Sequence, residues 1–168
     1  MMQMFNAAGD GDVVTIRKLA AEGADVNVPG ARGARPLHMA AQEGHVDAVR
    51  VLVEAGAEVE ASADDGVRPL FLAAKGGHLA VVETLVELGA DKEAATDAGF
   101  TPLHMATGHG HVEVVDTLME LGADIGALTE DGETPLQISI DCGHHHVARV
   151  LRALERSART KKEAGTRA

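Results

Sequence analysis

Residues 99–124 read GFTPLHMATGHGHVEVVDTLMELGAD, and this pattern returns along the chain every 33 residues. One proline stands near the start of each copy, and the four are Pro36, Pro69, Pro102 and Pro135. A glycine-histidine pair follows at a constant distance, at Gly44-His45, Gly77-His78, Gly110-His111 and Gly143-His144. A fixed period of this size indicates a repeat protein whose units stack in one direction.

Each copy predicts two short helices. Proline suits the first helical turn, where no backbone donor is needed, and the threonine of Thr101-Pro102 or Thr134-Pro135 can cap that turn. The glycine before each histidine favours a helix end, and a second apolar run such as residues 112–119 follows it. Helices of about eight to ten residues are marginal alone, so we expect each pair to be stable only against its neighbours.

The composition limits the classes of protein. The 168 residues are 45% hydrophobic but include three Phe and no Trp or Tyr, so we expect a core of Ala, Val and Leu. The single cysteine, Cys142, excludes an intramolecular disulfide, and the N-terminus lacks a basic region followed by an apolar run. We therefore expect an intracellular protein, cytoplasmic or nuclear. No stretch approaches the roughly 18 apolar residues of a membrane span, so no membrane contact is expected.

The net charge of -11 is unevenly distributed. Residues 149–168 carry seven basic and two acidic side chains, whereas residues 1–148 carry 8 basic and 24 acidic ones. Nucleic-acid binding relies on Lys and Arg to neutralise phosphates, so this acidic body argues against DNA or RNA as a ligand.

The quoted segment resembles the ankyrin signature G-x-T-P-L-H-x-A-x-x-x-G-H-x-x-V-x-x-L-x-x-x-G-A-D. The resemblance covers roughly residues 2–156 and gives five units with their caps, at approximately 1–29, 30–62, 63–95, 96–128 and 129–156. It implies an all-α repeat fold, an ankyrin-type solenoid of stacked helix-turn-helix pairs with projecting hairpin loops. It also implies a concave face of hairpin tips and first helices that binds proteins, and no catalytic apparatus.

The end of the chain departs from the pattern. Glu155-Arg156 replaces the Gly-Ala pair that ends the other second helices, so the last second helix can continue for a turn or more. Arg149 and Arg152 suit the solvent-exposed outer side of a capping unit. Residues 1–156 are therefore expected to form the repeat domain. Residues 157–168 lack periodicity and are expected to form a flexible basic tail, either solvated or paired with acidic groups.

Arginines replace the capping threonine in the second and third units. Arg35 and Arg68 cannot accept the N–H bond of a helix start, so two helices lose a cap. With Arg32 they would form a basic strip that binds a partner's carboxylates or phosphates. The alternative is that these arginines are solvated and balance the charges of nearby Asp64 and Asp65.

The residues after the hairpin glycines suggest an apolar centre. Val67 and Phe100 would be neighbours, and Phe71 replaces the usual histidine beside them. An aromatic anchor inside a polar rim is typical of binding hot spots, and the expected rim is Arg68, Asp97 and Lys75. The alternative is that the phenylalanines pack as core, which we favour for Phe71, whereas we favour exposure for Phe100. The candidate partner-binding residues are Arg32, Arg35, Asp64, Asp65, Val67, Arg68, Phe71, Lys75, Asp97, Phe100, His109, Glu130, Asp131 and Glu133.

Nine histidines raise the question of a metal. His109, His145 and His146 lie outside the repeated columns, near Cys142, and imidazole and thiolate are zinc ligands. No C-x-x-C or H-E-x-x-H spacing supports a site, and the GDGD of residues 9–12 lacks the spacing and lysine of a phosphate loop. We expect no catalytic residue, metal or cofactor.

The sequence thus predicts a monomeric, non-enzymatic module or scaffold that binds a protein partner of unknown identity. A regulatory subunit of an enzyme complex and a histidine-based metal or pH sensor are the alternatives.

Overall fold

The structure is a computed structural model that describes the backbone of residues 2–165 and the side chains of residues 2–157. It contains no strand within those residues. The first helices of the units are α1 Met2–Asp10, α3 Pro36–Gln42, α5 Pro69–Gly76, α7 Pro102–Gly108 and α9 Pro135–Asp141. The second helices are α2 Val13–Ala21, α4 Val46–Glu54, α6 Leu79–Glu87, α8 Val112–Glu120 and α10 His145–Gly165. Single 3-10 turns lie at Ala31–Gly33 and Asp64–Gly66.

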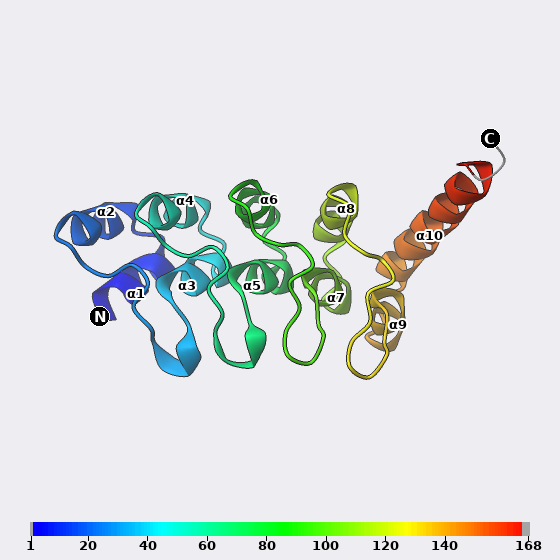
Figure 1. Ribbon diagram of the computed structural model, residues 1–168, viewed down its shortest axis with the longest axis horizontal. Helices are drawn as coiled ribbons and strands as arrows, with labels where there is room; N and C mark the ends of the chain where they lie inside the picture. Colours follow the sequence, from blue (N-terminus) through cyan, green and yellow to red (C-terminus); the bar gives the residue numbers. More distant parts are fainter. Residues whose placement is uncertain (1, 166–168) are drawn as a thin grey trace.

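The helix pairs stack side by side into an elongated array (Figure 1). The first helices form the middle row, the second helices form a row on one side of it, and the hairpin loops project on the other. The predicted all-α repeat solenoid is therefore confirmed.

Small aliphatic residues form one continuous core along the stack. In each of the three internal units a leucine of the first helix is at most 2% exposed, and these are Leu37, Leu70 and Leu103. The alanines that face the next first helix, such as Ala41 and Ala74, are fully buried. Burying a leucine stabilises the fold by about 1.5–3 kcal/mol, and the small alanines let adjacent helices approach closely.

The histidine of each glycine-histidine pair joins its unit to the unit before it. The imidazole Nε2–H of His78 donates to the carbonyl of Gln42 at 2.8 Å, and that of His144 donates to Gly108 at 3.0 Å. His45 and His111 make the same bond to Gly9 and Lys75, both at 2.9 Å.

The glycine of the preceding unit makes room for this histidine. Gly110 has a φ of +78°, and a Cβ there would lie 2.7 Å from Nδ1 of His144. Gly143 has nearly the same backbone, with a φ of +77°, but nothing lies within 4 Å of its would-be Cβ. Internal glycines therefore serve both the turn and the stacking contact.

A second pair of histidines links each first helix to the following hairpin. His38 and His104 are 1% and 0% exposed. Their Nε2–H groups donate to the carbonyls of Val67 and Glu133 at 3.1 and 3.2 Å, and Nδ1 of His104 accepts the Thr101 N–H at 3.1 Å. Burial lowers the pKa of both imidazoles, so they are neutral in the fold.

The residue before each first helix decides whether that helix has a side-chain cap. Thr134 Oγ1 accepts the N–H of Gln137 at 3.2 Å, which is the predicted cap. The guanidinium groups of Arg35 and Arg68 have no acceptor, so α3 and α5 begin without a side-chain cap, as expected.

The C-terminal helix differs from the expectation. α10 runs without a break to Gly165, so residues 157–165 continue the second helix instead of forming a separate tail. The reason is local: Glu155-Arg156 removes the usual glycine stop, and the following residues to Ala164 are mostly good helix formers. Residues 166–168 of the expected tail lie outside the described residues.

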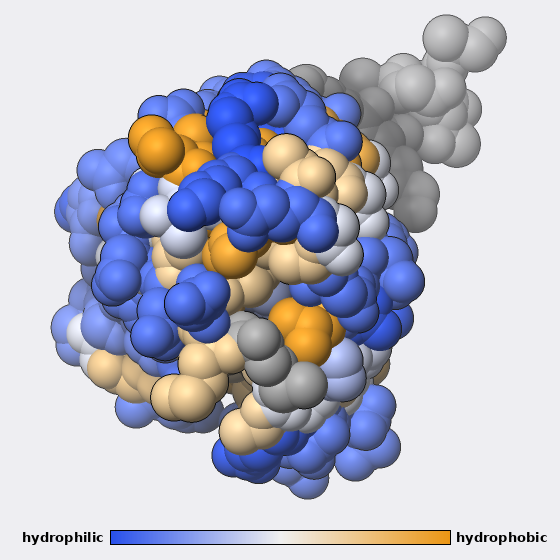
Figure 2. Space-filling model, turned by 90° about the vertical axis from the view of Figure 1, so that its left-hand side faces the viewer, coloured by the Kyte–Doolittle hydropathy of each residue, from blue (hydrophilic) through white to orange (hydrophobic). Residues whose placement is uncertain are grey.

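Polar residues predominate at the N-terminal end of the stack. Figure 2 views this end and shows mostly hydrophilic side chains with several separate hydrophobic patches, and Met2 and Val14 are 79% and 78% exposed. Asp12 occupies the histidine column here, and its carboxylate accepts the Thr15 N–H at 3.0 Å. The hydroxyl of Thr15 lowers the pKa of Asp12. The first unit thus caps its own second helix at the position where internal units bond to a neighbour.

Gly110→Ala should destabilise the protein more than Gly143→Ala. Both changes place a side chain at a positive φ, which costs about 1–2 kcal/mol. Only the first also displaces His144 and its bond to Gly108, which adds about 1 kcal/mol. Urea unfolding of the two variants measures the difference, and equal losses would show that the glycine-histidine contact does not stabilise the stack.

Acidification should destabilise the fold through His38 and His104. Because their pKa values are lowered by folding, the unfolded chain binds more protons below the ordinary value of about 6.5. This contribution is fully present above that pH and is lost as the pH falls below it. We expect His38→Phe, His104→Phe, which copies the residue at position 71, to reduce the drop in melting temperature between about pH 7.5 and about pH 5.5.

The exposed His109→Phe is the matched control and should leave that drop unchanged. An undiminished drop in the double variant would contradict the assignment.

Candidate functional site

The hairpin tips form a continuous edge. The backbone N–H of Asp97 donates to the carbonyl of Asp65 at 2.9 Å, and that of Glu130 donates to Ala98 at 3.0 Å. Between the second and third units, the exposed side chains of Arg32 and Asp65 form an ion pair at 3.4 Å. Adjacent tips are thus held in register from the second unit to the fifth.

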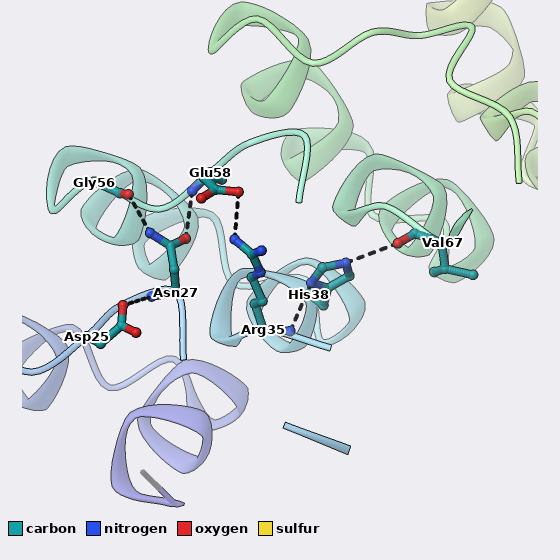
Figure 3. A network of polar contacts seen from close by, with 7 residues as sticks. All are labelled: Asp25, Asn27, Arg35, His38, Gly56, Glu58 and Val67. Carbon is teal, nitrogen blue, oxygen red and sulfur yellow. Dashed lines mark hydrogen bonds and ion pairs between the residues drawn. The ribbon is translucent and has the colours of Figure 1, made fainter. Parts of the chain in front are cut away.

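Arg35 and Arg68 are held by groups of this chain. Nη1 of Arg35 lies 2.6 Å from Oε2 of Glu58 (Figure 3). Nε of Arg68 lies 3.2 Å from Oε2 of Glu60, and Nη1 donates to the carbonyl of Ala95 at 3.2 Å. The expectation that Arg35 and Arg68 pair with Asp64 and Asp65 is therefore wrong. The expected basic strip is reduced to Arg32, itself paired with Asp65.

Glu58 belongs to a wider network that the sequence did not predict. The side chain of Asn27 donates to the carbonyl of Gly56 at 2.8 Å and accepts the Glu58 N–H at 2.9 Å (Figure 3). One period later Glu60 accepts the Asp91 N–H at 3.0 Å, and Glu93 accepts that of Asp124 at 2.9 Å. The spacing of 33 residues between polar side chains was the available signal. These side chains build the scaffold.

The expected apolar centre lies in a partly accessible position. Val67, Phe71 and Phe100 are all half-buried, so Phe71 is less buried than the core position we favoured and Phe100 is less exposed than we favoured. The Phe100 ring meets the His104 ring edge-on, with centroids 6.0 Å apart at 77°. Phe100 is thereby positioned by the same histidine that ties α7 to the fifth hairpin.

A depression of about 300 Å³ lies along the first helices, lined by Gln42, Leu72, Lys75, Gly76 and His109. It brings together two candidates, Lys75 and His109, while Gln42, Leu72 and Gly76 were missed. Their sequence signal is weak: Gln42 and Gly76 occupy positions that vary from unit to unit, whereas the position of Leu72 is apolar in units two to five. Larger but shallower space, about 350 Å³, lies between α1 and α2 of the first unit, away from the tips.

His109 has a fixed orientation in this depression. Its Nδ1–H donates to the carbonyl of Met105 at 3.0 Å, which leaves Nε2 as an acceptor. The ring stacks on His111 with centroids 6.1 Å apart at 10°. Because Nε2 of His111 is bonded to the Lys75 carbonyl, the scaffold positions both Lys75 and His109.

Five candidate carboxylates remain along the tips of units three to five. Asp64, Asp97, Glu130 and Asp131 are exposed and Glu133 is half-buried. Among the residues that the structure describes, none of the five forms an ion pair with a basic side chain. The tip edge is therefore an uncompensated acidic surface.

The structure offers little for a metal. No group of three or more His, Cys, Asp or Glu in the described part of the chain could hold a metal ion. His145, His146 and Cys142 are exposed, and Nδ1 of His146 accepts from Arg149 at 2.7 Å. No helix among the described residues is long and apolar enough to cross a membrane.

Comparison with known protein families adds a match over nearly the whole chain. The family described as ankyrin repeats (3 copies) matches residues 4–96 and 92–163. No curated protein matches the chain. The matched residues, the 33-residue period and the stacked helix pairs agree, and the chain belongs to the ankyrin-repeat family.

Proposed function

We propose that this protein is a non-enzymatic binding module that holds a protein partner on its concave face, over the hairpin tips and first helices of units two to five. Ankyrin repeats are in general protein-protein interaction modules. The observation that supports the proposal for this chain is the depression around Leu72, Lys75 and His109, which opens on the first-helix row.

The division of the polar groups also supports this face. The histidines of the repeated columns, the capping threonines and the Asn27 network are bonded within the stack. The side chains of Lys75, Asp97 and Glu130 are exposed instead. A stable interface takes about 20–30 residues from each side, a number that the tips and first helices of four units can supply.

The two alternative functions make different demands on the structure. A regulatory subunit of an enzyme complex would use the same face and differ only in the identity of its partner. A metal sensor needs a cluster of ligands, and no such cluster lies among the described residues. A pH sensor would use titratable imidazoles, and His38 and His104, whose pKa values are lowered by burial, bond adjacent units of the scaffold. The exposed His109 and His145 remain testable by zinc titration of the protein and of the variant lacking both.

A photo-crosslinking residue should distinguish the two faces of the stack. Benzoylphenylalanine at position 75, in the depression, should give discrete covalent adducts with a protein in cells that naturally express this chain. The same residue at exposed Glu83, on α6 of the other helix row, is the matched control and should give none. Adducts that form only at position 83, or identically at both positions, would contradict the proposal.

Leu72→Glu should weaken capture of the crosslinked partner by about tenfold or more, since it puts a charge into the depression. Unchanged helix content, measured by circular dichroism, is required to attribute this loss to binding. Full capture by a folded variant would exclude the depression from the interface.

A further inference from the structure

We infer that the partner segment is basic, a chain in the polyproline II conformation with Lys or Arg at about every third position that crosses the hairpin tips of units three to five. This inference rests on the proposed function, because it specifies the partner of the same concave face.

The first step is the charge. Asp64, Asp97, Glu130, Asp131 and Glu133 have no basic partner among the described side chains, whereas nearby arginines are paired within the chain. Like charges held along one edge repel one another, and a partner that supplies cations removes this repulsion. Complementary charge of this kind raises association rates and excludes acidic competitors.

The second step is the spacing. Backbone bonds from Asp97 to Asp65 and from Glu130 to Ala98 hold the tips in register. Helices that pack side by side lie about 8–10 Å apart, so the acids of successive tips recur at about that interval. A polyproline II chain advances about 3.1 Å per residue with three residues per turn, so three residues span one unit and side chains three positions apart point to the same side. A cation at every third position meets one tip after another.

The third step is the neighbouring apolar surface. Phe100 is half-buried beside the acidic edge, and Leu72 lines the depression on the first helices. A purely cationic segment would leave both unused. The intervening positions of the segment are therefore expected to include apolar side chains, which pack here while the cations bind the tips.

The basic C-terminal helix of this chain is the main competing occupant. Exposed Arg149, Arg152 and Arg156 lie on α10, which points away from the hairpins in Figure 1. The hairpin tips of the same chain therefore lie on the opposite side of the stack from α10. Only a second copy could place these arginines there, and the experiment below separates that case.

The test uses two fluorescent peptides and two sets of variants. One peptide of about 12 residues carries Arg at every third position between Leu and Pro, and the other has the same composition with its arginines clustered. The tip variant is Asp97→Asn, Glu130→Gln, Asp131→Asn. The control removes three exposed charges from the second-helix row with Glu83→Gln, Asp116→Asn, Glu120→Gln.

Fluorescence anisotropy at about 0.15 M salt should show the spaced peptide binding the unmodified protein more tightly than the clustered one. The tip variant should lose about tenfold in affinity for the spaced peptide, and the control should change it by less than about twofold. Equal losses in both variants would indicate attraction by net charge alone and overturn the inference. Equal affinity for the two peptides would overturn the register.

Two further outcomes separate this inference from the proposed function. If position 75 crosslinks a partner whose binding the tip variant does not weaken, the concave face binds and the basic segment is wrong. If the crosslinker at position 75 gives no adduct with any protein, the proposed function itself fails. If the unmodified protein sediments as a dimer and the tip variant as a monomer, the segment that binds the tips is α10 of a second copy and not part of a foreign protein.

Discussion

No internal unit of this protein completes its hydrogen bonds or buries its core alone. The histidine of each glycine-histidine pair donates to a carbonyl of the unit before it, as His78 does to Gln42 at 2.8 Å. His38 and His104 donate in the opposite direction, to the hairpins that follow. Because short helices are marginal alone, stability resides in these shared contacts, and the fold exists only as a stack.

This dependence separates scaffold groups from surface groups. Many polar residues that return every 33 positions are used between units, and the Asn27, Glu60 and Glu93 column is an example. Asp64, Asp97 and Glu130 return at the same spacing but form no ion pair within the described residues. What remains exposed on the first helices and hairpin tips is free to vary without loss of the stack. In this chain those surfaces hold unpaired carboxylates, Phe100 and the depression at Leu72.

The sequence predicted the stack because its signals are local. Pro102 and Gly110 set a helix start and a turn through their own backbone preferences. The partners of Arg35 and Arg68 could not be predicted, since a long side chain can reach several acids and only the packing of hairpins selects Glu58 and Glu60. The depression was missed for a similar reason, because it depends on how α3, α5 and α7 are placed relative to one another. The continuation of α10 past Glu155-Arg156 was expected from the missing glycine stop, but its full length to Gly165 was not predicted, because residues 157–165 lack apolar periodicity.

Circular dichroism of a peptide comprising residues 96–128 alone tests most directly whether the contacts between units maintain the fold. The account predicts little helix and no cooperative melting, because the peptide lacks the Lys75 carbonyl that His111 binds and the fifth hairpin that His104 binds. A single unit that is helical and unfolds cooperatively would contradict it.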